Sequence, residues 1–320
     1  MSATARKAPY TKSDPATRRD AYQELTDTIV AALEAGKRPW VRPWDPSKAG
    51  GPAMPVNAVT GRRYRGINVL VLSIASFAFG GDPRFCTYKQ ATEAGWQVKA
   101  GSKSTTVFFY KKLTVIDRDA PAGSDDTKTI PMIRTFNVFN GSQIEGIPAF
   151  ILPTVEDAPW RRPEAAEIIV RNSGAVVRTG GERAFYAPGE DFVQMPTDSS
   201  FADAGGWAST MLHEMAHWTG HKSRLARVMT GVARGSSAYA QEELRAELAS
   251  VFLGAELGLP CDLPNNVSYL AEWVTALRND KREIFHAASA AQKIADMLLG
   301  FHPEYAAAAV GVSDPVEEAS

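Results

Sequence analysis

The sequence predicts an α+β fold divided into two domains, on three observations. The chain has 320 residues, which exceeds the length of an ordinary single domain. Segments with helical periodicity and segments with an extended pattern occur in both halves. The net charge of −1 conceals a division, because residues 1–112 carry 18 Lys and Arg against 8 Asp and Glu, whereas the remainder carries 17 against 28. We therefore expect one basic domain that meets a polyanion and one acidic domain that does not.

The first half begins with a polar stretch, residues 1–19, which lacks periodicity and is expected to be disordered. Residues 20–36, DAYQELTDTIVAALEAG, have the apolar stripe of an amphipathic helix that ends at a glycine. Residues 67–80, INVLVLSIASFAFG, predict a second helix. The segments TTVFFYKKLTVI (105–116) and IPMIRTFNVFN (130–140) have the β-branched and aromatic density of strands.

The second half begins with a predicted helix, EAAEIIVRNSG, followed by two extended segments, AVVRTG and RAFYAPGEDFVQMP. A helix with histidines comes next, then the helix AQEELRAELASVFLGAELG and a largely helical remainder to about residue 300. The proline-rich segment IEGIPAFILPTVEDAPWRRP between the halves is typical of a linker. The expected division is a disordered arm at 1–19, a first domain at 20–149, a second domain at 150–305 and a flexible tail at 306–320.

Composition excludes several classes of protein. No apolar run reaches the roughly 18 residues of a membrane helix, and the polar start has no apolar core of a secretory signal. Cys86 and Cys261 are the two cysteines, too few for a disulfide framework or a cysteine zinc site. We expect a cytoplasmic protein without a membrane partner.

The segment HEMAHWTGH, residues 213–221, contains three of the five histidines. His213 and His217 are four residues apart and share one face of a helix. With Glu214 they form H-E-x-x-H, in which two imidazoles bind Zn²⁺ and the glutamate moves protons for an attacking water molecule. A capping box from Ser200 to Asp203 is expected to start this helix. The alternative is a coincidental pair of histidines on a partly buried helix.

A catalytic zinc ion usually takes three protein ligands. The metzincin pattern is excluded because Ser223 stands where it requires a histidine, and His221 follows the expected end of the helix. Glu243 and Glu247 share one flank beside the apolar stripe of their helix. We predict that Glu243 is the third ligand and that Glu247 accepts a hydrogen bond from the other ring nitrogen of a ligand histidine.

Two alternatives remain open at this site. The two glutamates of the flank could instead be solvated on an exposed helix. Imidazole also suits divalent transition metals other than zinc. Glu242 is expected on the opposite flank and is predicted to be dispensable for metal binding.

A protein substrate would need a surface beside the metal. The extended segment RAFYAPGEDFVQMP is expected to supply an edge strand along which a peptide chain lies. Tyr239 precedes the ligand helix and could donate a hydrogen bond to the oxyanion, or it could serve packing alone.

In the basic half, aromatic and basic residues alternate, as in KRPWVRPW and GRRYRGIN. Single-stranded nucleic acid is bound by aromatic rings that stack on bases within a cationic groove. The expected stacking residues are Trp40, Trp44, Tyr64, Phe85 and Tyr88. The expected phosphate contacts are Arg62, Arg63, Arg65, Lys89, Lys99 and Lys103. The alternative is that the aromatic residues build the core and the basic residues only solvate the surface.

Long segments in both halves carry a family resemblance. PVNAVTGRRYRGINVLVL and TYKQATEAGWQVKAGSKSTTVFFY resemble the N-terminal domain of ArdC-type antirestriction proteins, and HEMAHWTGHKSRLAR and YAQEELRAELASVFLGAELG resemble their zincin-like metallopeptidase domain. The resemblance implies a protein of a plasmid or other mobile element that binds single-stranded DNA and protects incoming DNA from host restriction. It also implies Zn²⁺ on His213, His217 and Glu243, with Glu214 as the catalytic glutamate.

The function that the resemblance implies is therefore antirestriction by a protein with a zinc metallopeptidase domain. Its protein substrates are expected to sit on DNA, restriction enzymes being the natural candidates. One alternative is a protector that coats single-stranded DNA without proteolysis and whose metal site is structural or vestigial. A metal-dependent nuclease is disfavoured, because nuclease sites more often use several carboxylates and two metal ions.

Overall fold

The computed structural model describes residues 20–41, 53–116, 127–151, 163–227, 236–259 and 269–310. The expected disordered arm, Trp44, Cys261 and most of the linker lie outside these residues. Among the described helices, none has the length and apolar character needed to cross a membrane.

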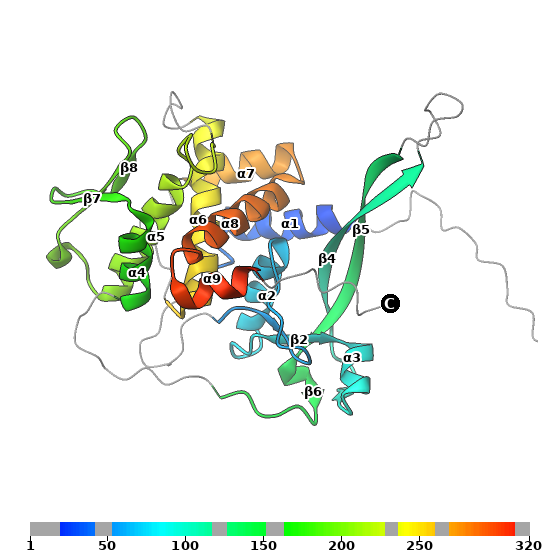
Figure 1. Ribbon diagram of the computed structural model, residues 1–320. Coiled ribbons are helices and arrows are strands. Elements are labelled where there is room, and N and C mark those ends of the chain that lie inside the picture. The colour runs from blue at the N-terminus through cyan, green and yellow to red at the C-terminus, as the bar shows by residue number, and fades with distance from the viewer. Residues whose placement is uncertain are drawn as a thin grey trace, which may run out of the picture.

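The N-terminal half combines helices with a four-stranded sheet in the order β1-β2-β5-β4. Strands β4 and β5 pair antiparallel over their length and form a long ribbon that extends away from the body of the molecule (Figure 1). A small second sheet pairs β3 with β6. The elements are α1 (Ala21–Glu34), β1 (Val56–Asn57), α2 (Ile67–Phe77), β2 (Arg84–Thr87), α3 (Tyr88–Glu93), β3 (Gln97–Val98), β4 (Thr105–Ile116), β5 (Thr127–Asn140), η2 (Gly141–Gln143) and β6 (Ile144–Glu145).

The C-terminal half is mainly helical, with a three-stranded sheet in the order β7-β9-β8 at one end (Figure 1). The elements are α4 (Glu164–Ser173), β7 (Val176–Thr179), β8 (Phe185–Ala187), β9 (Phe192–Met195), η3 (Asp198–Ser200), α5 (Ala204–Trp218), α6 (Ser237–Leu257), α7 (Leu270–Asn279), α8 (Glu283–Leu299) and α9 (Pro303–Val310). The α+β expectation is confirmed. Helix α9 continues to Val310, so residues 306–310 of the expected flexible tail are helical.

The two halves share one hydrophobic core. Leu33 of α1 and Leu70 of α2 belong to the same buried cluster as Phe252 of α6 and Leu298 of α8. Helix α1 packs on α7, and α2 packs on α6 and α8 (Figure 1). Because apolar surface from both halves is removed from water in one cluster, cutting the chain between them would expose part of that core.

Helix α5 begins later than the sequence predicts. Asp203 is its N-cap and accepts a hydrogen bond from the backbone N–H of Gly206 at 2.8 Å. Ser200, the expected capping residue, ends the preceding 3₁₀ turn η3 instead. A carboxylate at an N-cap satisfies a backbone donor and favours the positive end of the helix dipole.

Candidate metal centre

Two packed helices bring three metal-binding side chains together. His213 and His217 lie on one face of α5, and Glu243 faces them from α6. The Nε2 atoms of the two histidines are 3.2 Å apart. Glu243 places Oε2 3.5 Å from Nε2 of His213 and Oε1 3.6 Å from Nε2 of His217. All three residues are buried, with 6–7% of their surface exposed.

These distances fit a shared ion. Two atoms that are each about 2.1 Å from a tetrahedral ion lie roughly 3.4 Å from one another, and the three observed separations are 3.2, 3.5 and 3.6 Å. The imidazole rings are almost perpendicular, at 86°, with their Nε2 atoms turned to the same point. The site therefore has the donor set and spacing of a divalent metal centre with two histidines and one carboxylate.

The orientation of His217 is fixed by Glu242, which was expected on the flank away from the ligands. That expectation is wrong, because Glu242 contacts a ligand histidine. Oε1 of Glu242 lies 3.4 Å from Nδ1 of His217. Arg227 donates to the same carboxylate through Nη2 at 2.8 Å and is held in turn by the backbone carbonyl of Ala216 at 2.7 Å. With Nδ1–H donating to Glu242, the other ring nitrogen of His217 is left as the metal ligand.

Electrostatics keep the acidic groups of the site ionised. Burial raises the pKa of Glu242, but hydrogen bonds from His217 and Arg227 outweigh it and lower this pKa to about 2. Burial likewise opposes ionisation of Glu243, and the two histidines hold its pKa well below the usual range. Burial lowers the pKa of His217, but Glu242 and Glu243 raise it to about 10. Ionised carboxylates in a buried site favour a bound cation.

The role expected for Glu247 is corrected by these contacts. Its Oε1 accepts hydrogen bonds from Nη1 of Arg38 at 2.9 Å and from Nε1 of Trp40 at 3.2 Å. Both donors come from the N-terminal half, so Glu247 joins the two halves one helical turn beyond Glu243. Glu242 has the contact with a ligand histidine that was expected of Glu247.

Two further residues lie at the site. Glu214 is buried beside His213, and its charge contributes to the raised pKa of His217, so its carboxylate is close to the ligands. The hydroxyl of Tyr239 is 3.5 Å from that of Tyr269, and burial together with Tyr269 and Glu243 raises the pKa of Tyr239. Tyr239 therefore keeps its proton and remains a hydrogen-bond donor next to the centre.

The loop after α5 connects the centre to the three-stranded sheet. Arg224 donates to the carbonyl of Trp218 at 2.6 Å, to Oδ2 of Asp191 at 3.0 Å and to the hydroxyl of Tyr186 at 3.2 Å. These bonds hold the β8–β9 turn against the end of α5. The segment that was expected to supply one edge strand forms two strands instead: β8 lies at the edge of the sheet and β9 lies at its centre. His221 bonds with Ser223 at 2.7 Å, outside the ligand cluster.

The residues expected to bind DNA divide into three groups. Trp40, Tyr64 and Phe85 are core residues, 2%, 5% and 0% exposed, so their rings cannot serve as exposed stacking surfaces in this structure. Arg63 and Arg65 form ion pairs with Glu256 and Asp296 of the other half. The remaining described candidates are exposed and comprise Arg62, Tyr88, Lys89, Lys99 and Lys103.

Comparisons with known proteins match each half of the chain to a family model. Residues 19–139 match the family model of the N-terminal domain of the anti-restriction factor ArdC, and residues 164–290 match a zincin-like metallopeptidase. The metal-free crystal structure of the antirestriction ArdC protein from plasmid R388 is 36% identical, has a TM-score of 0.75, and is matched over 92% of this chain and 100% of that chain. The chain belongs to the ArdC family of antirestriction proteins. This confirms the family expected from the sequence.

Other relatives extend the comparison. A Mn(II)-bound structure of the R388 ArdC protein is 38% identical, with a TM-score of 0.72 over 88% of this chain and 98% of that one. The uncharacterised protein y4eC of Sinorhizobium fredii is 37% identical over 90% of this chain and 94% of its own length. A DNA primase TraC of Escherichia coli is 39% identical over 88% of this chain, which spans only 27% of the primase.

Proposed function

We propose that this ArdC-family chain is a zinc-dependent peptidase that also binds single-stranded DNA and protects incoming DNA from host restriction. The observation that carries the peptidase is the cluster of His213, His217 and Glu243 with Glu214 beside it. Two imidazoles and one carboxylate leave a coordination position open, as catalytic zinc sites do.

The chemistry of the site follows from its residues. A divalent ion held there would polarise a peptide carbonyl and lower the pKa of water. Glu214 takes a proton from the attacking water molecule, whose oxygen bonds to the carbonyl carbon. The C–N bond then breaks, and Glu214 returns the proton to the leaving amine nitrogen. Tyr239 would donate a hydrogen bond to the carbonyl oxygen as negative charge develops there.

Strand β8 gives the proposed substrate a place to bind. As an edge strand it pairs with β9 on one side only, which leaves backbone groups for an added extended peptide. Helix α5 packs against β8 and β9, so a peptide on this edge would lie near the histidines. The substrate class is therefore an extended segment of a protein chain.

Zinc is proposed rather than manganese on the chemistry of the donors. Manganese favours oxygen ligands, whereas imidazole suits zinc, and the cluster offers two imidazole nitrogens for one carboxylate. The relative from plasmid R388 nevertheless has a Mn(II)-bound structure. Metal analysis of the purified protein would separate the two metals.

Single-stranded DNA is proposed as the partner of the N-terminal half. The excess of 18 basic over 8 acidic residues in the first 112 positions supports contact with phosphates. The proposed protein substrates are restriction enzymes bound to DNA in the cytoplasm. If this chain and its substrate bind the same strand, the effective concentration of the substrate rises to roughly the millimolar range. Single-stranded DNA long enough to hold both proteins should then accelerate cleavage, whereas DNA that holds only one of them should not.

The variant Glu214→Gln tests the peptidase. It removes the proton acceptor while keeping the side-chain size and the three ligands, so metal content should be unchanged and cleavage of a restriction enzyme should fall at least a hundredfold. Restriction of incoming DNA in cells that carry the variant is measured alongside. Unchanged cleavage by Glu214→Gln would refute the assigned role.

The same variant tests the second candidate function, which is protection of DNA without proteolysis. The core shared by both halves, with Glu247 of α6 bonded to Arg38 and Trp40, is compatible with a metal site that only stabilises the fold. If Glu214→Gln protects incoming DNA as well as the original chain does, protection comes from coating single-stranded DNA and not from proteolysis.

A further inference from the structure

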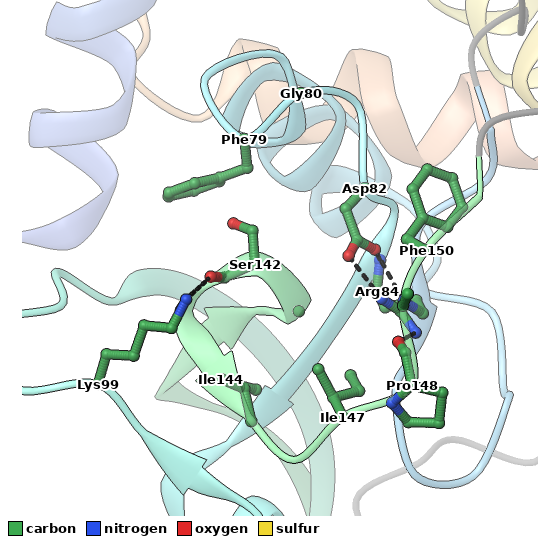
Figure 2. A pocket seen from close by; sticks show the side chains of 12 residues that line it. Phe79, Gly80, Asp82, Arg84, Lys99, Ser142, Ile144, Ile147, Pro148 and Phe150 are labelled. Atoms are coloured by element: carbon green, nitrogen blue, oxygen red, sulfur yellow. Dashed lines mark hydrogen bonds and ion pairs between the residues drawn. The ribbon is translucent and has the colours of Figure 1, made fainter.

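A pocket of about 400 Å³ lies in the N-terminal half and is separate from the metal centre (Figure 2). Its lining residues all fall between Phe79 and Phe150, so none belongs to α5 or α6. Pockets that hold small molecules or parts of larger ligands measure roughly 300–1,000 Å³. Lys99 is among the phosphate contacts expected from the sequence, but the pocket itself could not be predicted, because its walls come from segments that are far apart along the chain.

One wall of the pocket is a fixed ion pair. Arg84 donates to Asp82 through Nε at 2.9 Å and through Nη2 at 2.8 Å, and its Nη1 donates to the carbonyl of Pro148 at 2.7 Å (Figure 2). A Cβ on Gly141 would stand 2.6 Å from Oδ2 of Asp82, so only glycine allows this close packing. The two charges neutralise one another and the wall is rigid.

The opposite wall carries a cation that this pair does not neutralise. Nζ of Lys99 donates to the backbone carbonyl of Ser142 at 2.9 Å (Figure 2). Among the residues that the structure describes, no carboxylate forms an ion pair with Lys99. Gln143 accepts from the backbone N–H of Lys99 at 2.9 Å and donates to the carbonyl of Lys103 at 2.9 Å, which ties a second exposed lysine to the same edge.

The rest of the lining is apolar and aromatic. Phe79, two residues after the end of α2, stands above Ser142 in Figure 2, and Ile144 and Ile147 lie below. On the far side, the guanidinium of Arg84 lies 5.5 Å from the ring centre of Phe150. The pocket thus combines an aromatic face, an apolar floor and one uncompensated positive charge. A ligand that matches all three is flat, largely apolar on its faces and anionic at one edge.

We propose that this pocket binds one nucleotide of single-stranded DNA, with the base against Phe79 and a phosphate at Lys99. The inference rests on the DNA binding proposed above and specifies where it occurs. A stacked base and a lysine at the phosphate are the two contacts by which proteins hold single strands. An acidic peptide would use the charge but would have no use for the aromatic face.

The test uses the full-length, metal-loaded protein and fluorescein-labelled (dT)₁₂, with binding followed by anisotropy. Phe79→Ala should weaken binding about tenfold, the loss expected for one stacked base. Phe79→Tyr should restore it, since the aromatic face is kept. Lys99→Gln should weaken binding and reduce the slope of log affinity against log salt by about 0.7, the value for one phosphate of a single strand.

Matched controls separate the pocket from general effects. Lys293→Gln removes the same charge from an exposed position of α8, and Phe185→Ala removes an exposed phenylalanine from β8. Both should bind (dT)₁₂ as the original chain does. On a twelve-unit abasic strand, which keeps the phosphates, the effect of Phe79→Ala should disappear while that of Lys99→Gln remains. Equal thermal unfolding of all variants excludes misfolding.

The outcomes are distinct. If the original chain binds (dT)₁₂ and the Phe79 and Lys99 variants bind it equally well, the pocket is not the site, although the proposed DNA binding stands. If the original chain does not bind (dT)₁₂ at all, the proposed DNA binding fails and the pocket proposal with it. A poly-glutamate peptide could compete with (dT)₁₂ in a way that depends on Lys99 but not on Phe79. That result would overturn the proposal and identify the ligand as an acidic peptide. Binding of dTMP as tight as that of (dT)₁₂ would overturn it in favour of a free nucleotide.

Discussion

We predict that Glu242→Ala weakens metal binding through His217, in contrast to the expectation from the sequence that Glu242 is dispensable. The substitution removes the acceptor that lies 3.4 Å from Nδ1 of His217. Loss of such a hydrogen-bond partner of a ligand histidine typically weakens metal binding by about 10- to 100-fold, or about 1.4–2.7 kcal/mol. It also leaves Arg227, whose side chain is 13% exposed, without its carboxylate.

The free energy of unfolding of the metal-free protein should fall as well. Breaking a buried ion pair costs about 3–5 kcal/mol. Arg227 keeps its bonds to the carbonyl of Ala216 at 2.7 Å and to the hydroxyl of Thr219 at 2.9 Å. The lower end of that range is therefore expected, or about 3 kcal/mol.

The assay is competition for Zn²⁺ against a chelator of known affinity at fixed pH, with unfolding of the metal-free protein followed separately. Glu242→Gln is the matched variant, because it keeps an oxygen that accepts from Nδ1 but loses the charge. We expect it to weaken metal binding less than tenfold. Metal affinity of Glu242→Ala within twofold of the original chain would refute the reasoning, as would equal losses in the two variants.

Two further predictions concern the elements that support the centre. Glu247→Ala should lower the free energy of unfolding by about 3 kcal/mol, because it leaves Arg38 without this partner. Metal affinity should stay within about threefold of that of the original chain, and a tenfold loss of metal affinity would place Glu247 at the metal site after all. Asp203→Ala removes the hydrogen bond to Gly206 and should cost about 1 kcal/mol, measured by denaturant unfolding, with Asp198→Ala in the preceding turn as the control that should have a smaller effect.

The helix that carries the two histidines could be predicted from the sequence because its signals are local. His213 and His217 at a spacing of four, with an adjacent glutamate, define a face of one helix and one kind of chemistry. Glu243 was predicted because it lies beside the apolar residues Leu244 and Leu248 of its helix, although the structure buries nearly all of that helix from Ala240 to Ala255. The hydrogen-bond partner of His217 could not be predicted from local signals. It depends on Arg227, which comes from the loop after α5 and draws Glu242 toward the histidine.

The surroundings of the residues proposed to bind DNA were harder to predict for a related reason. Alternating aromatic and basic residues do not reveal which rings the fold buries. Trp40 is enclosed because α6 supplies Glu247 to its indole nitrogen, and Arg65 is paired because α8 supplies Asp296. Both partners lie more than 200 residues away in the sequence, so the shared core of the two halves decided their roles. Lys99 and Tyr88 remained exposed because no such partner covers them among the described residues.

The most direct test of the metal centre is the metal content of purified protein, measured by mass spectrometry on the original chain and on His217→Ala, Glu243→Ala and Glu190→Ala. Glu190 is an exposed glutamate near the end of the sheet and serves as the matched control. The original chain and Glu190→Ala should each hold one divalent ion per chain, with zinc as the metal, and the two ligand variants should hold less than about a tenth of that. Full metal content in either His217→Ala or Glu243→Ala would contradict the assignment of the three ligands.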